Sequence, residues 1–262
     1  MKLSSNDVLF EQEGHLAVIT LNRPKALNSI NPPLGNALQE ALEEVRDNDS
    51  IWVAILTGAG DRAFSAGADL RWRADNEDEV RTPDAGTGGK ILSSEFACWK
   101  PVIAAVNGYA VGGGLELAIA CDLIVAAERA QFGLPEPRRG LMADAGGVHG
   151  LSRQIPIKLA MEMILTGQFI DAQRAAEVGL VNRVVADDEL LAGAKELATS
   201  IMECSPKAVQ AAKQAVMLGG ELSFEEAMVT QFSMFDRLKE SGDFTEGPRA
   251  FSEKRAPKWE GA

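Results

Sequence analysis

Short runs of apolar residues, rich in branched side chains, alternate along the chain with stretches whose apolar positions recur at helical spacing. The first pattern is typical of buried strands, and the second of helices that bury one face. We therefore predict strands over residues 15–21, 52–57, 102–106, 123–127 and 180–185. Because helical patterns separate these runs, the chain is predicted to have an α/β fold.

The first helix is the most clearly marked, because an apolar stripe follows a capping residue. Asn31 can accept a hydrogen bond from a free amide of the first turn, which is the role of an N-cap. A second helix is predicted from Pro156 to near Gly167, and Asp171 caps a third that stops at Gly179. The stripe of the first helix comprises Leu34, Leu38, Ala41, Leu42 and Val45.

The strand pattern disappears in the last third of the chain, where only helical patterns remain. Ser205 and Pro206 form a strong helix start for residues 207–218. Ser223 and Glu226 form a capping box. Behind it, apolar residues recur at helical spacing: Phe224, Ala227, Met228, Phe232, Phe235 and Leu238.

This change in composition near residues 190–200 divides the chain into two predicted domains. Residues 1–195 are expected to form a core that holds the candidate site, and residues 196–262 a C-terminal helical subdomain. The stretch 74–90 is charged and rich in glycine, which predicts a mobile loop.

Charge and cysteine content narrow the classes of partner. A net charge of −12 disfavours nucleic acid or an anionic membrane as the main partner, because both need basic surfaces. Small anionic ligands need only a local site and remain possible. Cys98, Cys121 and Cys204 form no closely spaced pair, and no targeting or membrane-spanning segment is recognisable. We therefore expect a cytoplasmic protein.

A run of three glycines opens the most informative segment, residues 107–122. If a helix starts there, free amides point past residues without side chains and can bind an anion. Glu116 is the ionisable group near the start of this apolar segment, so its pKa should be raised, which suits proton transfer. The alternative is a glycine turn followed by a glutamate that favours the helix dipole.

Familiar catalytic signatures are missing from the sequence. It contains no phosphate-binding loop, no dinucleotide fingerprint and no nucleophile elbow. The two histidines are too few for a histidine-based zinc site and make a Ser-His-Asp triad improbable. His15 lies in a predicted strand and is expected to be structural. His149 lies in a predicted loop, where both a structural and a functional role remain open.

Two further segments can be read either as turns or as parts of a site. Residues 63–70 contain small side chains that let a ligand approach the backbone, or that make a tight turn. In residues 132–140, two prolines flank Glu136, and a rigidly held carboxylate suits catalysis better than a swinging one. Arg138 and Arg139 follow, and they are either solvated or paired with Glu136 or with ligand phosphates.

Together these segments resemble the crotonase family, the enoyl-CoA hydratase/isomerase superfamily. The resemblance rests on F-S-A-G-A-D-L at 64–70, N-G-Y-A-V-G-G-G-L-E-L-A-I-A-C-D at 107–122 and A-Q-F-G-L-P-E at 130–136. It continues through A-G-G, L-T-G and G-L-V-N-R-V-V further along, and covers about residues 8 to 260. It implies a repeated ββα spiral with a C-terminal helical trimerisation subdomain.

The resemblance also implies an activity. In this family two backbone amides hold the oxygen of an acyl-CoA thioester, and their positions match Ala66 and Gly113. Glu116 and Glu136 match the two glutamates of the hydratases, which add water to a 2-enoyl-CoA to give a 3-hydroxyacyl-CoA. Glu116 would activate water as a base, and Glu136 would supply the proton to C2. No metal or redox cofactor is implied, because coenzyme A is part of the substrate.

The same resemblance implies contacts with coenzyme A and an oligomer. The C-terminal contacts are often made by a neighbouring subunit, and family members are usually homotrimers or dimers of trimers. By position, the residues implied to contact coenzyme A are Arg23, Ala26, Ala66, Ala68, Asp69, Leu70, Gly113, Phe251 and Lys254.

Some positions depart from typical hydratases. Pro137 and two arginines follow Glu136, and Asp144 adds a third acid, which dienoyl-CoA isomerases and carnitinyl-CoA dehydratase-like members also have. The R-R-G-L stretch and the E-K-R-A-P-K-W ending look closer to the carnitinyl-CoA dehydratase-like members. The acyl group is therefore expected to be polar or branched. Two alternatives remain: a double-bond isomerase acting on enoyl-CoA or dienoyl-CoA on the same scaffold, and a non-catalytic relative that binds acyl-CoA or RNA.

Overall fold

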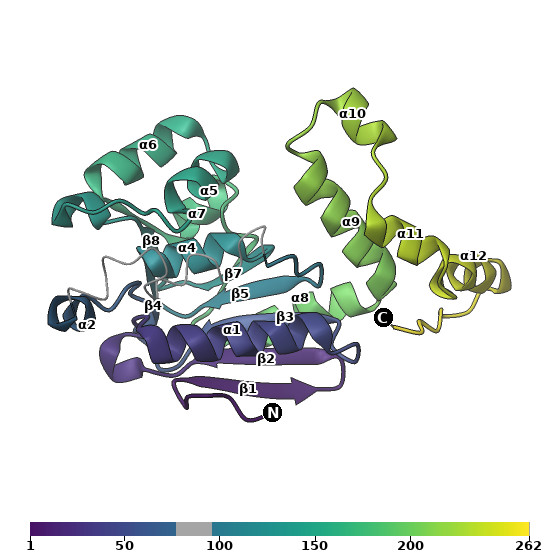
Figure 1. The fold of residues 1–262 in the computed structure, drawn as a ribbon, viewed down its shortest axis with the longest axis horizontal. Coiled ribbons are helices and arrows are strands. Elements are labelled where there is room, and N and C mark those ends of the chain that lie inside the picture. Colours follow the sequence, from purple (N-terminus) through teal and green to yellow (C-terminus); the bar gives the residue numbers. More distant parts are fainter. Residues whose placement is uncertain (77–95, 262) are drawn as a thin grey trace.

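The chain folds around two β-sheets in the computed structural model, which describes residues 1–76 and 96–261 (Figure 1). In the larger sheet β1 is antiparallel to β2, and all other neighbouring strands are parallel. In spatial order its strands are β1 (Val8–Glu13), β2 (Leu16–Leu21), β3 (Val53–Gly58), β5 (Val102–Val106), β7 (Leu123–Ala127) and β10 (Arg183–Val185).

A smaller sheet lies beside it and is built from short strands. These are β4 (Ala63–Ser65), β6 (Tyr109–Val111), β8 (Gln131–Gly133) and the antiparallel β9 (Phe169–Asp171). Successive turns of the chain contribute one strand to each sheet and then a helix, as in β3-β4-α2 and β5-β6-α4, where α2 is Leu70–Asp75 and α4 is Gly113–Ala120. The expected repeated ββα arrangement is confirmed.

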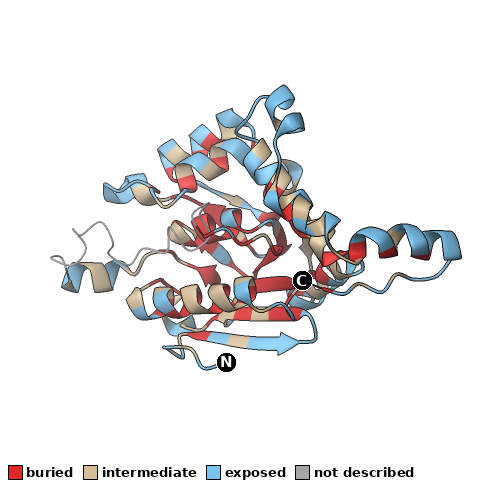
Figure 2. Cartoon of the chain, turned by 45° about the vertical axis from the view of Figure 1, so that its right-hand side comes forward, coloured by how far each residue is buried: buried red, intermediate tan, exposed pale blue. Residues whose placement is uncertain are grey.

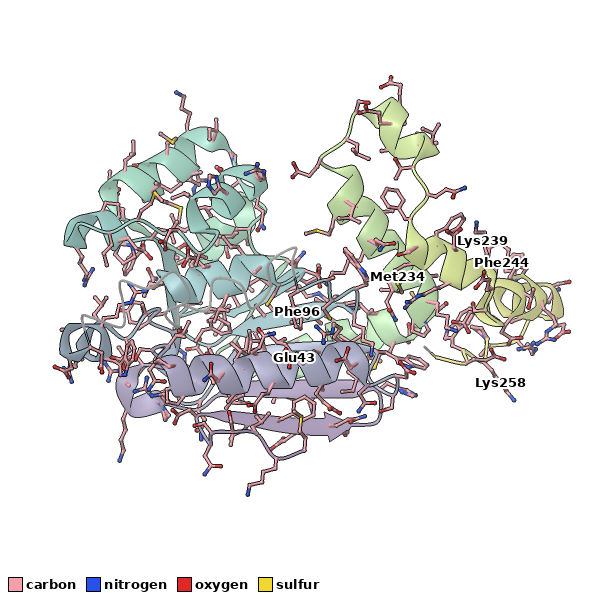
Figure 3. All side chains as sticks on the ribbon, viewed as in Figure 1. Glu43, Phe96, Met234, Lys239, Phe244 and Lys258 are labelled. Carbon is pink, nitrogen blue, oxygen red and sulfur yellow. The ribbon has the colours of Figure 1, made fainter. Side chains whose placement is uncertain are left out.

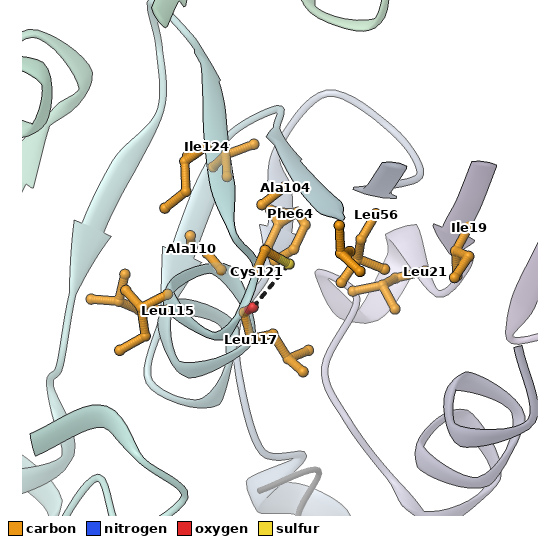
Figure 4. Packing of buried hydrophobic residues seen from close by; sticks show 14 of the residues in the cluster. Ile19, Leu21, Leu56, Phe64, Ala104, Ala110, Leu115, Leu117, Cys121 and Ile124 are labelled. Atoms are coloured by element: carbon orange, nitrogen blue, oxygen red, sulfur yellow. Dashed lines mark hydrogen bonds between the residues drawn. The ribbon is translucent and has the colours of Figure 1, made fainter. Parts of the chain in front are cut away.

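The strands of the larger sheet are apolar throughout because both of their faces are covered. Leu56 packs into a core that includes α1 (Pro32–Asp47) and α4, whereas its neighbour Ile55 packs against α8 (Leu190–Met202). Figure 2 shows buried residues concentrated in the centre of the molecule, and Figure 4 shows Phe64, Leu115 and Leu117 packed in the first core. The core thus fixes α4, which carries Glu116, against both sheets.

The predicted helix starts are confirmed. The Asn31 side chain accepts a hydrogen bond from the Leu34 amide at 3.1 Å, and the side chains of Asp171 and Ser205 cap α7 and α9 in the same way. The reciprocal hydrogen bonds of the Ser223 capping box are both present. After α1, the predicted helices have these bounds: α6 (Ile157–Thr166), α7 (Ala172–Glu177), α9 (Pro206–Gly219) and α10 (Phe224–Val229).

Each of the five predicted strands is present, with shifted ends in three cases. His15 and Trp52 lie just before β2 and β3, where their rings stack with centroids 3.8 Å apart, which supports a structural role for His15. The last strand begins at Arg183 rather than at residue 180. The sequence analysis did not predict β1 or the four strands of the smaller sheet.

The C-terminal apolar stripe runs through two helices with a break between them. After α10, residues 230–232 are extended, and α11 (Ser233–Lys239) then starts in a new direction. The buried side chain of Gln214 on α9 accepts a hydrogen bond from the Met234 amide at 2.8 Å, so it caps α11 where the helix turns back onto α9. Local spacing alone does not reveal such a tertiary anchor.

Two predictions concern regions at the edges of the core. The proposed domain boundary at residue 195 lies inside α8, which packs on the larger sheet, and the helices that project from the core begin with α9. Of the predicted loop 74–90, the first residues end α2, and residues 77–90 lie outside the described residues. In the described part of the chain, no helix is long and apolar enough to cross a membrane.

Candidate active site

A cavity of about 920 Å³ opens between α4, the start of α2, the 3₁₀ helix η3 (Glu136–Arg139) and α5 (Gly147–Gln154). This volume suits a small-molecule ligand. Asp144 and His149 also line the cavity. Six of the residues expected at the site line it: Ala66, Ala68, Leu70, Gly113, Glu116 and Glu136.

Glu116 projects from the first turns of α4 and is only 8% exposed. Its Oε1 accepts a hydrogen bond from the Gly147 amide at 2.9 Å. Burial raises the pKa of Glu116 to about 7; the charges of Glu136 and Asp144 add to this effect, and the amides of Gly147 and Ala145 oppose it. Glu116 therefore exchanges a proton near neutral pH, as expected from its apolar surroundings.

Glu136 opens η3, and its carboxyl group lies against Gly112, where a Cβ would be only 2.7 Å from Oε1. Its Oε2 is buried and has no hydrogen-bond partner within the described ranges. Burial raises the pKa of Glu136, and the charge of Asp144 raises it further, whereas its own backbone amide and the charge of Arg139 lower it. Two carboxyl groups with raised pKa values thus face one cavity, a pattern typical of catalytic sites.

The segment 66–69 presents its amides to two sides. The Ala66 amide donates to the Leu27 carbonyl at 2.9 Å, and the Asp69 amide donates to the Ile30 carbonyl at 2.9 Å. The intervening Gly67 amide donates to Ser65 Oγ at 3.1 Å. Ala66 is therefore wrong as an amide donor to the ligand, because the fold already uses its N–H.

The Ala68 amide is the free one in this segment. Ala68 pairs with Ile30 in a parallel bridge, whose two hydrogen bonds are made by the Gly67 carbonyl and the Asp69 amide. The N–H of Ala68 itself therefore points away from Ile30. Gly113 begins α4, and its N–H has no acceptor within the helix. Among the described residues neither amide donates a hydrogen bond, and both residues line the cavity.

Close packing brings these two amides together. A Cβ built on Gly113 would lie 3.5 Å from the Ala68 nitrogen. A Cβ built on Gly67 would lie 2.6 Å from the Gly113 nitrogen, and Gly67 has φ +77°, a conformation that favours glycine. The glycines are therefore required for two free N–H groups to converge on one point. Together they can bind a carbonyl oxygen that gains negative charge.

The family model described as enoyl-CoA hydratase/isomerase matches residues 11–262 of the chain. The chain belongs to the crotonase family. It is 44% identical over 253 residues to carnitinyl-CoA dehydratase of Proteus mirabilis, covering 95% of this chain and 96% of that protein. It is 40% identical over 255 residues to (E)-benzylidenesuccinyl-CoA hydratase of Thauera aromatica, covering 97% of this chain and 99% of that protein.

Solved structures agree with this assignment. The enoyl-CoA hydratase of Mycobacterium tuberculosis H37Rv superposes with a TM-score of 0.90 at 40% identity, covering 98% of this chain and all of that one. The fold is thus the α/β crotonase fold with a C-terminal helical region. The chain is a crotonase-family hydro-lyase that acts on acyl-CoA thioesters.

Three residues expected to contact coenzyme A in this crotonase are not among those that line the cavity. Arg23 Nη1 pairs with Asp69 Oδ2 at 3.0 Å, and Asp69 Oδ1 accepts a hydrogen bond from the Trp72 amide, which caps α2. Burial would raise the pKa of Asp69, but the Trp72 amide and Arg23 outweigh it and lower that pKa. Ala26 lies in the short helix η1 (Pro24–Ala26) that follows Arg23. Arg23 and Asp69 thus support the cavity from outside.

Phe251 and Lys254 are not brought to the cavity within one chain. They lie at the end of α12 (Asp243–Glu253), on the opposite side of the molecule from α2 (Figure 1). Figure 3 labels Phe244 in this helix and Lys258 in the segment that follows it. Phe251 is 88% exposed. The expected contact with coenzyme A therefore requires a neighbouring subunit.

The structure also identifies groups that sequence reasoning missed. The Gly147 amide orients Glu116, and a Cβ at Gly147 would approach Glu116 Oε1 to 2.9 Å. The A-G-G motif at 145–147 was the available signal, but it did not say which group the motif serves. The Ala68 amide was missed because the side to which an extended residue points depends on its pairing partner.

Proposed function

We propose that this crotonase catalyses the reversible addition of water to the C2=C3 bond of a 2-enoyl-CoA thioester. One observation carries the proposal: the carboxyl groups of Glu116 and Glu136 face one cavity beside the free amides of Ala68 and Gly113. Hydration needs a base for water, an acid for C2 and donors for the thioester oxygen. The cavity contains all of these groups.

In this proposal the thioester oxygen lies between the Ala68 and Gly113 amides. As water adds to C3, negative charge develops on that oxygen, and fixed N–H donors stabilise it without having to reorganise. Each such donor contributes about 3–4 kcal/mol to lowering the barrier in comparable sites.

The two glutamates move the protons. In hydration Glu116 takes a proton from the attacking water, and Glu136 gives a proton to C2. In dehydration Glu136 removes the C2 proton, and Glu116 protonates the departing hydroxyl group. Because their charges interact, the two carboxyl groups titrate as a pair that shares one proton in the active form.

We infer further that the acyl group is polar or branched. The relatives named as carnitinyl-CoA dehydratase and (E)-benzylidenesuccinyl-CoA hydratase act, by their names, on substituted acyl groups. The cavity is also lined beyond the glutamates by charged or polar side chains, which a plain fatty acyl chain would not need: Arg73, Arg138, Arg139, Asp144 and His149.

Incubation of the enzyme with a panel of enoyl-CoA thioesters in ¹⁸O-labelled water tests the proposal. Hydration incorporates ¹⁸O at C3, and the best substrates are expected to carry a polar or branched acyl group. Movement of the double bond without ¹⁸O incorporation would identify an isomerase instead. Calorimetry that showed acyl-CoA binding without any turnover would identify a non-catalytic binder.

Glutamine variants test the residue roles. Replacing Glu116 or Glu136 by glutamine should lower kcat by about 10²–10⁴-fold, because general acid–base catalysis contributes that much. Circular dichroism and acyl-CoA binding should stay near wild type. Full turnover in either variant would refute the assigned role of that glutamate.

A further inference from the structure

Arg139 places a positive charge at the cavity in a position that the reaction scheme above does not use. It is exposed, it lines the cavity, and it makes no ion pair with any residue in the described ranges. It is the last residue of η3, and Glu136 is the first. Because side chains three residues apart eclipse one another in a 3₁₀ helix, Arg139 and Glu136 share one face of this turn.

The neighbouring Arg138 differs in its contacts, although both arginines line the cavity. Its Nε donates to the Thr166 carbonyl at the end of α6 at 2.7 Å, and its side chain packs against Gly167. Its guanidinium is thus tied to the helix end, whereas that of Arg139 is available to the cavity. The two arginines offer a matched comparison within one turn.

The charges that face Glu136 come from several elements. Arg139 is on its own turn, Glu116 is on α4, and Asp144 is in the loop before α5. The element α6 packs on η3 but contributes no charged side chain to the cavity lining, and α5 contributes His149. Arg139 is the cation among the groups whose charge acts on Glu136 directly.

The two glutamates need opposite protonation states, although burial pushes the pKa of each in the same direction. Two similar carboxyl groups that share one proton have no built-in preference for which of them holds it. An unequal electrostatic environment supplies that preference.

We propose that Arg139 is a positioning residue for the glutamate pair: its guanidinium, carried by the same 3₁₀ turn as Glu136, holds Glu136 in the charged form and leaves the shared proton on Glu116. This is the state from which dehydration starts. Glu136 then takes the proton from C2, the C3–O bond breaks, and Glu116 gives its proton to the departing hydroxyl group. Hydration runs through the same steps in reverse and restores that state.

This inference rests on the proposed function, and its first test uses the pH profile of kcat/KM. In Arg139→Met the acid limb should move to higher pH, because Glu136 then binds protons more readily. Above that limb the rate should fall only modestly, because part of the shared proton then lies on Glu136, whereas Glu136 that stays charged is a stronger base. Both reaction directions should shift alike, because the overall equilibrium is fixed.

Matched variants separate this effect from a structural one. Arg139→Lys should restore the wild-type limb, and Arg138→Met should leave the limb in place. Asp144→Asn should move the limb to lower pH, because it removes a negative charge that acts on both glutamates. An acid limb that stays in place in Arg139→Met, with or without a change in rate or KM, would overturn the proposal.

A direct titration keeps this test separate from the proposed function. Glutamate labelled with ¹³C at Cδ reports each carboxyl group by NMR, and the Glu136 signal is assigned with Glu136→Gln. Its midpoint should rise in Arg139→Met and return in Arg139→Lys. An unchanged midpoint would overturn the role of Arg139 even in an active hydratase. If no enoyl-CoA is hydrated but the midpoint rises as expected, the proposed function fails and the charge effect stands.

Discussion

Glu116 shows how the fold prepares a single side chain for proton transfer. The carboxyl group is held in a mostly buried position and accepts a hydrogen bond from the Gly147 amide. The same burial that raises its pKa to about 7 makes its charged form costly to the folded protein. Catalytic readiness and loss of stability therefore have one cause at this residue.

Stability should fall as the pH rises past the folded pKa of Glu116. A raised pKa gives a contribution that is complete below the ordinary value of 4.5 and is lost as the pH passes about 7. Integrated over that interval, the loss is at most about 3 kcal/mol. Glu116→Gln, which cannot ionise, should flatten this part of the profile and be the more stable protein at alkaline pH.

Urea denaturation across the pH range measures this effect. The exposed Glu162 on α6 gives a control, and Glu162→Gln should keep the pH dependence of the wild type. If Glu116→Gln falls in stability with rising pH as steeply as the wild type, another group is responsible.

Gly67 makes a second prediction at the residue scale. In Gly67→Ala the new methyl group would approach the Gly113 nitrogen to 2.6 Å, so it should displace one of the two free amides. Losing one such donor lowers kcat by roughly 10²–10³-fold in comparable enzymes. Single-turnover kinetics on the best enoyl-CoA would measure the loss.

Gly179→Ala is the control for backbone strain. Gly179 has φ +82°, close to that of Gly67, and nothing lies within 4 Å of its Cβ position. Both variants should lose about 1–2 kcal/mol of stability from the left-handed conformation. Gly179→Ala should keep full turnover. Equal turnover in the two variants would show that Gly67 matters only as a turn.

At the scale of elements, the sequence predicted those parts of the fold that long apolar runs and side-chain caps determine. β5 and β7 have the predicted bounds, because each is an apolar run buried on both faces. The edge strand β1 was missed because only Val8 is buried in it. The strands of the smaller sheet have three residues each, too few for a period to show.

The site could be predicted as side chains but only partly as backbone. The surroundings of Glu116 and Glu136, an apolar segment and two flanking prolines, made them candidates, and the family resemblance then implied their roles. The free amide at Ala68 depends on which side of the chain pairs with Ile30, and that pairing joins segments far apart in sequence. Sequence patterns do not contain that information.

The start of α2 offers a prediction about an element rather than a single contact. Asp69 caps this helix and pairs with Arg23, and it directly follows Ala68. Asp69→Ala removes both interactions and should cost about 1 kcal/mol for the cap alone. It should also lower kcat/KM, because the contacts of Asp69 no longer fix the position of the neighbouring Ala68 amide.

Asp69→Asn separates the two interactions. Asparagine can still cap α2 but cannot pair with Arg23 as an ion. Thermal unfolding and steady-state assays of both variants should place Asp69→Asn between the wild type and Asp69→Ala. If Asp69→Ala matches the wild type in both measurements, α2 does not depend on this residue.

At the scale of the whole molecule, the C-terminal helices project from the core with many apolar side chains exposed. Val216, Phe224, Met228 and Val229 on α9 and α10, with Phe251 on α12, are all more than two-thirds exposed. Apolar side chains exposed to this extent mark sites of protein association. We propose that copies of this chain assemble through these helices into a homotrimer or a dimer of trimers.

Such an assembly predicts that the active site is shared between subunits. If Phe251 and Lys254 of one subunit complete the coenzyme A site of the next, a double variant Phe251→Ser, Lys254→Ala should bind acyl-CoA weakly while keeping its own Glu116. Glu116→Gln should have the opposite defect, because its Phe251 and Lys254 are intact but its own site cannot catalyse the reaction. Reassembly from equal amounts of the two variants should then restore activity, with about one site in four complete over all the trimers that form, because a cyclic assembly pairs each site with the C-terminal segment of one neighbour. Sedimentation velocity establishes that mixed trimers form, and unmixed variants provide the baseline. Mixed trimers no more active than that baseline would show that each chain completes its own site.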